Sequence, residues 1–390
     1  MTTALKAAAP RGRSNRLRNV TRQIIWARGA GRCHMCNVDL IGDLVSGAED
    51  ANFGFIAHIV ADAPDGPRGD AELSHLLADD PGNLMLLCHV HHKAIDVELV
   101  DEYPVERLLR IKADHERRVS IRTGVLPERA SHVVRYAANV GQHRRTMPYQ
   151  EIARAMMPDR HPANGRETID LSLHGSVIED DEQAYWALEA ANLRRQMSHR
   201  VSERIEVGEI DHMSVFAFAP QPLLILLGSL LGDITPADVY QLHREPAGWA
   251  WPEGGSEMPL VATSPAVLGK GPVALKIALS ADVNDARVRA VLGDDVDIWT
   301  LTTPKPNNDV LKRKEDLLAF RTELRLLLNR IKADRPDADV INILPAMPVS
   351  AAVEVGRAWM PKADLPLDVW DENRKIGGFG RALRIDGALG

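Results

Sequence analysis

The sequence predicts two domains of different fold class, an α+β domain over residues 1–125 and an α/β domain over residues 126–390. All three cysteines and a dense group of histidines lie between residues 33 and 92. A charged helical segment then ends at Gly124-Val125-Leu126-Pro127, a strong helix-breaking sequence. Beyond it, short apolar runs alternate with long amphipathic segments, which is the pattern of an α/β fold.

Length and composition are those of a globular protein. The chain has 390 residues, of which 45% are hydrophobic and 26% are charged, enough for two or three well-buried cores. No apolar run approaches the roughly 18 residues that a membrane-spanning helix needs. We therefore expect a cytoplasmic protein that has no membrane segment.

Charge is unevenly distributed along the chain. The net charge is −7, yet no acidic residue precedes Asp39, and the same segment holds eight cations: Lys6, Arg11, Arg13, Arg16, Arg18, Arg22, Arg28 and Arg32. A basic arm suits contact with nucleic-acid phosphates, although residues 1–14 could also be a solubilising tail. The rest of the chain is acidic, which argues against a general DNA-binding surface there.

The cysteines have the spacing of metal ligands. Cys33 and Cys36 form a CxxC motif, and Cys88 and His91 form a CxxH motif, a donor set typical of a tetrahedral structural zinc site. A thioredoxin-like redox motif would follow a strand, whereas this CxxC follows a glycine-rich loop. Three cysteines without a signal peptide do not indicate a disulfide framework. The remaining alternative is buried cysteines with chance spacing.

The segment from Gly31 to Asp96 resembles the HNH endonucleases, a family with a ββα-metal fold. The pattern is CxxC, then His-Ile, then an Asn-Leu run that ends in the CxxH motif and a second histidine. It is carried by Cys33, Cys36, His58, Ile59, Asn83, Leu84, Leu87, Cys88, His91, His92 and Asp96. The resemblance covers about a sixth of the chain and implies hydrolysis of double-stranded DNA.

The resemblance assigns chemical roles to the HNH residues. His58 would take the proton of the attacking water, because a neutral histidine is a base near pH 7. His92 would bind a divalent cation that stabilises the phosphate and the leaving oxygen, Mg²⁺ by default with Mn²⁺ and Ni²⁺ as alternatives. Asn83 would either orient the His58 loop or coordinate that cation.

One position departs from the family pattern. Ala57 stands where many family members carry an Asp or His metal ligand. Either another side chain replaces that ligand, or the cation keeps an extra water. The candidates are His89 and Asp96, which lies one helical turn after His92.

The elements of the first domain follow from breakers and periodicity. We expect a helix over residues 15–27 and a β-hairpin within 49–60 that delivers His58. A loop rich in Pro, Gly and Asp should cover 61–80. A helix should begin over 91–97, and the charged segment 103–123 should form a longer helix.

In the second domain, apolar runs bounded by Pro or Gly are assigned as strands and amphipathic runs as helices. The expected strands cover 168–173, 215–219, 272–279, 294–301 and 340–344. The expected helices cover 181–200, a leucine-rich segment ending at 231, and 311–333. Phe218-Ala219-Pro220 is followed by Gly228, and Ala346-Met347-Pro348 is followed by Gly356 at the same spacing. Each motif joins a strand to a helix, which predicts two tandem copies of one α/β unit.

This duplication resembles the SAVED domain, which is similar to two fused CARF (Rossmann-like) units. The resemblance also rests on Trp249-Ala250-Trp251 in the first copy, and on Leu344-Pro345-Ala346-Met347-Pro348 with Gly356-Arg357 in the second. It implies that the second domain binds a cyclic di- or trinucleotide made during phage infection. An HNH nuclease fused to a SAVED domain is similar to the effector nucleases of bacterial CBASS anti-phage systems.

Nucleotides in open α/β sheets bind beyond the carboxyl ends of strands, where helix N-termini attract phosphate. We therefore expect the turns Pro220-Gln221-Pro222 and Ala346-Met347-Pro348 to line the site. Trp251 would stack on a base, and Lys305 or Arg194 would pair with a phosphate. Each has an ordinary alternative, since tryptophan is common in cores and proline commonly ends strands.

Three functions are compatible with these features. The first is a DNase that a cyclic nucleotide activates by assembly into a dimer or tetramer. The second is a restriction-type nuclease whose second domain reads DNA directly. The third is a zinc-stabilised nucleic-acid-binding module without activity, for which Ala57 is the only support.

Overall fold

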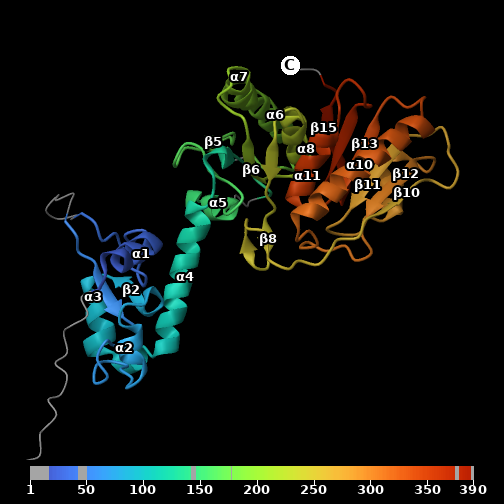
Figure 1. Ribbon diagram of the computed structural model, residues 1–390. Helices are drawn as coiled ribbons and strands as arrows, with labels where there is room; N and C mark the ends of the chain where they lie inside the picture. Colours follow the sequence, from blue (N-terminus) through green and yellow to red (C-terminus); the bar gives the residue numbers. More distant parts are fainter. Residues whose placement is uncertain (1–16, 43–50, 142–145, 177, 374–376, 388–390) are drawn as a thin grey trace, which may run out of the picture. The chain divides into compact units, whose positions relative to one another are not determined.

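The computed structural model describes residues 17–42, 51–141, 146–176, 178–373 and 377–387. Contacts divide the chain into two compact units, Met1–Leu126 and Pro127–Gly390 (Figure 1). Half of the cations of the expected basic arm, from Lys6 to Arg16, lie outside the described residues. Within the described ranges, no helix is long and apolar enough to cross a membrane.

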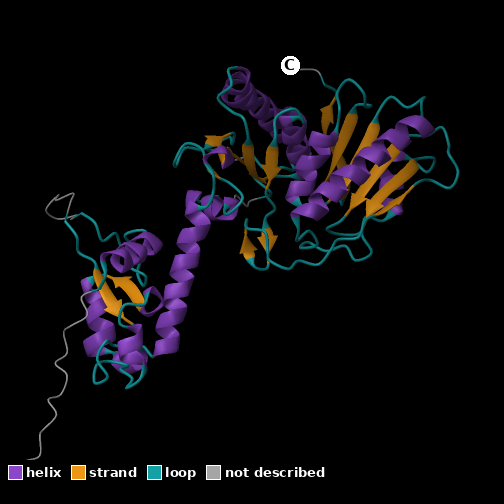
Figure 2. Ribbon diagram, in the orientation of Figure 1, coloured by secondary structure: helices purple, strands orange, loops and turns teal. Residues whose placement is uncertain are grey.

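The N-terminal unit is built around a two-stranded antiparallel sheet (Figure 2). Its elements are α1 (Asn19–Gly29), β1 (Phe55–His58), α2 (Leu73–Leu77), the 3₁₀ turn η1 (Pro81–Asn83), β2 (Leu84–Leu87), α3 (His89–Lys93), the π-helical turn η2 (Ala94–Glu98), η3 (Val100–Glu102) and α4 (Val105–Thr123). All four residues of β2 are buried and pack with Ile25 of α1 and Leu108 of α4. This apolar core fixes β1, which ends at His58, and β2, which lies between Asn83 and Cys88.

The prediction of a β-hairpin within residues 49–60 is wrong, because β1 pairs with a different segment of the chain. In the part of this segment that the structure describes, β1 pairs with the distant β2, with His58 opposite Leu84. The apolar run of β2 supplies the buried partner that the short polar segment before β1 does not. The expected loop 61–80 contains the short helix α2, and α1 begins only at Asn19 because Arg18 has an extended backbone.

The C-terminal unit contains two larger sheets. After the turn η4 (Pro127–Arg129), its elements are β3 (Ala130–Ala137), α5 (Tyr149–Met156), β4 (His161–Pro162), β5 (Ile169–Asp170), α6 (Gln183–Met197), η5 (Ser198–Ser202), α7 (Glu203–Glu206), β6 (Met213–Phe218), α8 (Gln221–Leu231), β7 (Ala237–Val239), β8 (His243–Arg244), β9 (Ala247–Gly248), β10 (Val261–Thr263), β11 (Val273–Ala278), α9 (Asp285–Leu292), β12 (Asp297–Thr302), α10 (Lys314–Asp334), β13 (Ile341–Ala346), α11 (Val349–Ala358), β14 (Leu367–Asn373) and β15 (Gly378–Ile385). The expected strands and helices are present, with ends shifted by a few residues.

The two sheets share one topology. In the first, β5, β3, β6 and β7 are neighbours in that order and all parallel. In the second, β12, β11, β13 and β14 are neighbours in the same order and also parallel. The connections match as well, since α6 and α8 flank β6 in the chain as α10 and α11 flank β13. The predicted tandem α/β repeat is therefore present in the structure.

The two repeats are joined through their equivalent helices. α8 packs against α11, and each also contacts the sheet of the other repeat: α8 touches β14 and β15, and α11 touches β6 and β7. The helices thus form a layer between the sheets, as Figure 2 shows. A single hydrophobic core runs through both repeats, including Val215 of β6 and Ile343 of β13.

Candidate functional sites

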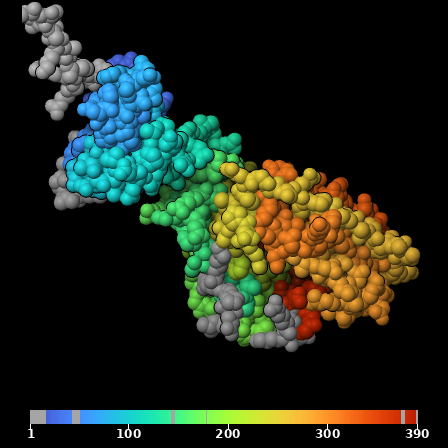
Figure 3. Space-filling model, turned by 90° about the horizontal axis from the view of Figure 1, so that it is seen from below, coloured from blue at the N-terminus to red at the C-terminus, as the bar shows by residue number. Residues whose placement is uncertain are grey.

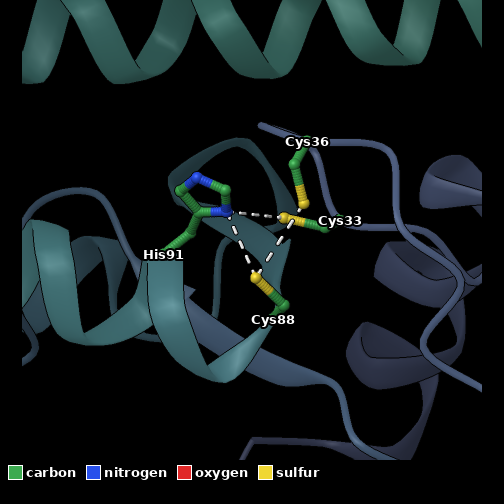
Figure 4. Close-up of side chains that lie close together, drawn as sticks. All are labelled: Cys33, Cys36, Cys88 and His91. Atoms are coloured by element: carbon green, nitrogen blue, oxygen red, sulfur yellow. Dashed lines mark hydrogen bonds between the residues drawn. The ribbon is translucent and has the colours of Figure 1, made fainter.

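The four expected zinc ligands lie together in the N-terminal unit (Figure 4), with their ligand atoms all within 4.8 Å of one another. His91 Nδ1 lies 3.2 Å from Cys88 Sγ and 3.6 Å from Cys33 Sγ, and Cys36 Sγ lies 3.9 Å from Cys88 Sγ. A tetrahedral zinc about 2.3 Å from each sulfur separates its ligand atoms by roughly 3.8 Å. Both the donor set and the spacing therefore fit zinc.

Local structure explains how the four ligands converge. The N–H of Cys33 donates to the carbonyl of Val38, and the N–H of Asn37 donates back to the carbonyl of Cys33, so the CxxC segment closes into a tight turn. Cys88 is the N-cap residue of α3. His91 follows by three residues, which places its ring on the same face of the helix.

His58 ends β1 with its ring half-buried. Its Nε2 lies 2.9 Å from the carbonyl oxygen of Ala78. A carbonyl can only accept a hydrogen bond, so Nε2 carries the hydrogen and Nδ1 keeps its lone pair in the neutral ring. This tautomer leaves one nitrogen able to accept a proton, as a general base requires.

The Asn83 amide is occupied by backbone groups. Its Oδ1 accepts from the N–H of Val60 at 2.8 Å, and its Nδ2 donates to the carbonyls of Val60 and Leu77 at 2.8 and 3.2 Å. The side chain is buried, with 4% exposed. Of the two roles that the sequence left open, this geometry favours orientation of the chain that follows His58.

His92 and Asp96 lie one turn apart across the junction of α3 and η2. His92 Nε2 is 3.5 Å from Asp96 Oδ2. The His92 ring also stacks on Phe55 of β1, with ring centres 5.1 Å apart and planes 24° apart. π-helical turns such as η2 are frequent at functional sites, where they redirect side chains. His92 Nε2 and Asp96 Oδ2 are thus neighbouring donor atoms in the N-terminal unit.

Sequence reasoning missed Arg68. This residue lies in the loop between β1 and α2, where an arginine is normally expected on the surface. Its side chain is instead buried, 6% exposed, and forms an ion pair with Asp96 at 2.7 Å. No spacing or motif marks Arg68, so only the three-dimensional structure reveals it.

In the C-terminal unit, Trp251 lies between two neighbouring cavities. One, of about 540 Å³, is lined by Trp251, by Ala155 and residues 157–159 before β4, by residues 252–255, and by residues 312–315 at the start of α10. The other, of about 230 Å³, is lined by Trp251, Lys314, Arg321 and Arg357 among others. Figure 3 shows the yellow surface around residue 250 beside the orange surface of the α10 region. The larger cavity is within the size range of small-ligand sites.

The two strand-to-helix turns meet across the repeat. The side-chain Oε1 of Gln221 accepts the N–H of Met347 at 3.2 Å. Pro220, Pro222 and Pro348 are buried, and Ala346 is half-buried. The turns are therefore neighbours, as the tandem repeat implied, although their prolines are packed inside.

The two predicted phosphate-binding cations are placed differently. Lys305 is exposed in the loop after β12, where its carbonyl accepts from the Asn307 side chain. Arg194 lies in the last turn of α6. Neither is among the residues that line these two cavities, whereas Lys312, Arg313 and Lys314 are.

Comparison with protein families identifies part of the C-terminal unit. Residues 193–385 match the family described as the SMODS-associated and fused to various effectors sensor domain, SAVED. The SAVED resemblance is therefore confirmed over residues 193–385, just under half of the chain. The match begins within α6, so it covers β6, α8 and β7 of the first repeat and every element of the second. The comparison with curated proteins found no match.

Solved structures that match this chain include two of an Acinetobacter baumannii Cap4 SAVED/CARF-domain containing receptor, with the cyclic trinucleotides 2'3'3'-cAAA and 3'3'3'-cAAA. Their TM-scores are 0.42 and 0.43 at 8% and 9% identity, over 81% of this chain and 60% of those chains. The Moraxella osloensis Cap4 receptor gives a TM-score of 0.38 at 10% identity, over 74% of this chain and 59% of that one. This chain thus spans about 60% of the length of these receptors.

Proposed function

We propose that this chain, whose residues 193–385 form a SAVED sensor domain, is a cyclic-nucleotide-activated DNA endonuclease of a bacterial anti-phage defence system. The observation that carries the proposal is the presence on one chain of this sensor match and of the HNH motif residues. Zinc held by Cys33, Cys36, Cys88 and His91 would brace the nuclease unit.

In the nuclease unit, His58 is the proposed general base. Its Nδ1 accepts a proton from water while the carbonyl of Ala78 holds the Nε2 hydrogen and fixes the ring. The deprotonated oxygen attacks phosphorus as the P–O bond to the leaving 3′ oxygen breaks. That oxygen takes a proton from solvent, and His58 then returns its own proton to solvent. Asn83 keeps the His58 segment in place through Val60.

His92 and Asp96 are the proposed ligands of the catalytic cation. Neighbouring ligands of an octahedral Mg²⁺ lie about 3 Å apart, close to the 3.5 Å between His92 Nε2 and Asp96 Oδ2. A bound divalent cation supplies Lewis-acid stabilisation of the phosphate and leaving oxygen. Asp96 then provides an oxygen ligand in place of the one that Ala57 lacks.

The proposed nucleotide site is the larger cavity beside Trp251. The indole would stack on a base, and the cations at the start of α10 would face phosphates, with help from the N-terminus of that helix. α10 follows β12 in the chain, which places its start on the carboxyl side of the second sheet. Lys314 is ion-paired with Asp159, so a phosphate would have to displace this carboxylate.

A cyclic nucleotide activates the nuclease only if it binds the active arrangement more tightly than the resting one. Moving the protein from about 1% to about 99% active needs roughly 5.5 kcal/mol of differential binding. Assembly into a dimer or a ligand-induced tetramer is the proposed source, because a symmetric assembly pairs the nuclease units.

The test is cleavage of linear double-stranded DNA by the full chain, with and without a panel of cyclic di- and trinucleotides. The panel includes 2'3'3'-cAAA and 3'3'3'-cAAA, and molar mass is followed by light scattering. We expect little cleavage alone, and a rise in both rate and mass with one panel member. Rapid cleavage by the ligand-free protein, unchanged by every nucleotide, would contradict the gating. Cleavage confined to particular DNA sequences would favour the restriction-type alternative.

A further inference from the structure

Arg68 lies outside the HNH motif, yet it is buried against both halves of it. Its Nε donates to the carbonyl of Ile59 at 2.8 Å, and its Nη1 donates to the carbonyl of Ile95 at 2.5 Å. Nη2 donates to Asp96 Oδ1 at 2.7 Å and lies 3.5 Å from the carbonyl of His58. A buried guanidinium is stable only when its donors are matched in this way.

These contacts join two segments that lie far apart in the sequence. β1 carries His58, the proposed base, and η2 carries Asp96, which faces His92 with its second oxygen. Through its rigid guanidinium group, Arg68 binds both the backbone carbonyls at the end of β1 and the carboxylate of Asp96. Asn83 grips Val60, so residues 58–60 are held by two side chains.

The backbone conformation of Arg68 is a second indication that its side chain has a function. Arg68 has φ +56°, the left-handed region that costs a non-glycine residue about 1–2 kcal/mol. Glycine is used at Gly66 and Gly69 of the same loop, and a Cβ on Gly69 would lie 2.5 Å from the carbonyl oxygen of Pro64. The loop is thus tightly wound, and an arginine occupies a conformation that glycine adopts without cost. Strain of this kind at a non-glycine residue points to a function of its side chain.

We propose that Arg68 is a positioning residue of the nuclease site. It sets the separation between His58 and the His92–Asp96 pair, and it orients Asp96 as the carboxylate that replaces the ligand missing at Ala57. This inference rests on the proposed nuclease function. Lysine cannot take over the role, because a single ammonium on a flexible stem cannot donate at once to the Ile59 and Ile95 carbonyls and to Asp96.

The experiment compares full-length Arg68→Lys and Arg68→Gly with the wild type. Arg68→Gly relieves the backbone strain while removing the guanidinium, and Arg68→Lys keeps the charge. Arg335→Lys is the matched control, because Arg335 is equally buried, 5% exposed, and binds Asp297, Asp337 and the carbonyl of Gly271 in the other unit. Four quantities are measured: Mn²⁺ affinity by electron paramagnetic resonance, cleavage rate against Mn²⁺ concentration, zinc content and melting temperature.

We expect both Arg68 variants to bind Mn²⁺ roughly 10- to 100-fold more weakly, the effect typical of losing a partner that orients a metal ligand. Cleavage should need correspondingly more Mn²⁺, while zinc content stays unchanged. Arg335→Lys should lower only the melting temperature. If Arg68→Gly does not fold, Arg68→Lys decides the question.

Two results would overturn the proposal. One is wild-type Mn²⁺ affinity in Arg68→Lys. The other is a loss of stability alone, as in the Arg335 control, because it assigns Arg68 a purely structural role. A wild-type protein that never cleaves DNA would instead refute the nuclease function, and the Mn²⁺ affinities would still decide the role of Arg68 toward His92 and Asp96.

Discussion

Gly228 of α8 and Gly356 of α11 face each other where the two central helices of the C-terminal unit cross. A Cβ on Gly228 would lie 1.9 Å from the carbonyl oxygen of Val353, and a Cβ on Gly356 would lie 1.9 Å from that of Ile225. The two glycines are equivalent in the tandem repeat. The repeats therefore approach at a point where only hydrogen fits on either backbone.

The first prediction follows from this crossing. Gly356→Ala should lower the melting temperature of the C-terminal unit strongly, because the contact is with backbone and cannot relax by side-chain rotation. Overpacking typically costs about 1–3 kcal/mol, and we expect the upper end or beyond. Differential scanning calorimetry measures the change. Gly378→Ala is the control, since a Cβ there meets nothing within 4 Å, and equal melting of the two variants would contradict the packing argument.

The second prediction concerns the zinc site. Cys36→Ser and Cys88→Ser should each reduce bound zinc below one ion per chain and lower the stability of the N-terminal unit, because structural zinc contributes free energy of folding. Elemental analysis and thermal melts measure both effects. A strong chelator should destabilise the wild type and change the variants less. A wild-type protein that is purified without zinc yet melts normally would refute the site.

The third prediction separates the base from the residue that orients it. His58→Ala should abolish cleavage and leave zinc content and melting temperature close to wild type, because the ring makes one polar contact, with Ala78. Asn83→Ala should reduce cleavage and also destabilise the unit, since it leaves the Val60 backbone groups unpaired, at about 1–3 kcal/mol. The assignment fails if His58→Ala keeps full activity.

The fourth prediction concerns the proposed nucleotide site, where two substitutions should weaken nucleotide binding and one should strengthen it. Trp251→Ala and Lys314→Ala should weaken cyclic-nucleotide binding, since they remove a stacking surface and a phosphate partner. Asp159→Asn should strengthen it, because Lys314 would no longer have to break its ion pair with Asp159. Isothermal titration calorimetry with the activating nucleotide measures all three. Lys305→Ala tests the loop cation expected from sequence, and a loss only in that variant would move the site to the loop.

The two units differ in how much of their structure could be predicted from the sequence. Periodicity and breakers predicted the strand–helix order of the C-terminal unit, because its strands and helices carry apolar runs that become buried and the motif spacing marks equivalent positions. The partner of β1 was missed, since strand pairing depends on distant apolar segments such as β2. In the site, ligand spacing along one helix indicated Cys88 and His91. Arg68 was not predicted, because a buried cation in a loop belongs to no periodic sequence pattern.

The last prediction concerns pH and the C-terminal unit. Burial lowers the pKa of His212 and of His243 from 6.5 to about 4. The unfolded chain therefore binds more protons than the folded one between pH 6.5 and 4. The free energy of unfolding should fall across that window as pH decreases, by up to about 1.4 kcal/mol per pH unit for each histidine.

Asp371 acts in the opposite direction, because burial raises its pKa to about 7 and the folded state keeps its proton as pH falls. The measured quantity is therefore the difference between wild type and His243→Gln in denaturant midpoints from pH 7.5 to 4. We expect the variant to lose less stability than the wild type as pH falls from 6.5 toward 4, since it lacks one of the two protonations. Parallel curves for the two proteins would show that His243 titrates normally when folded.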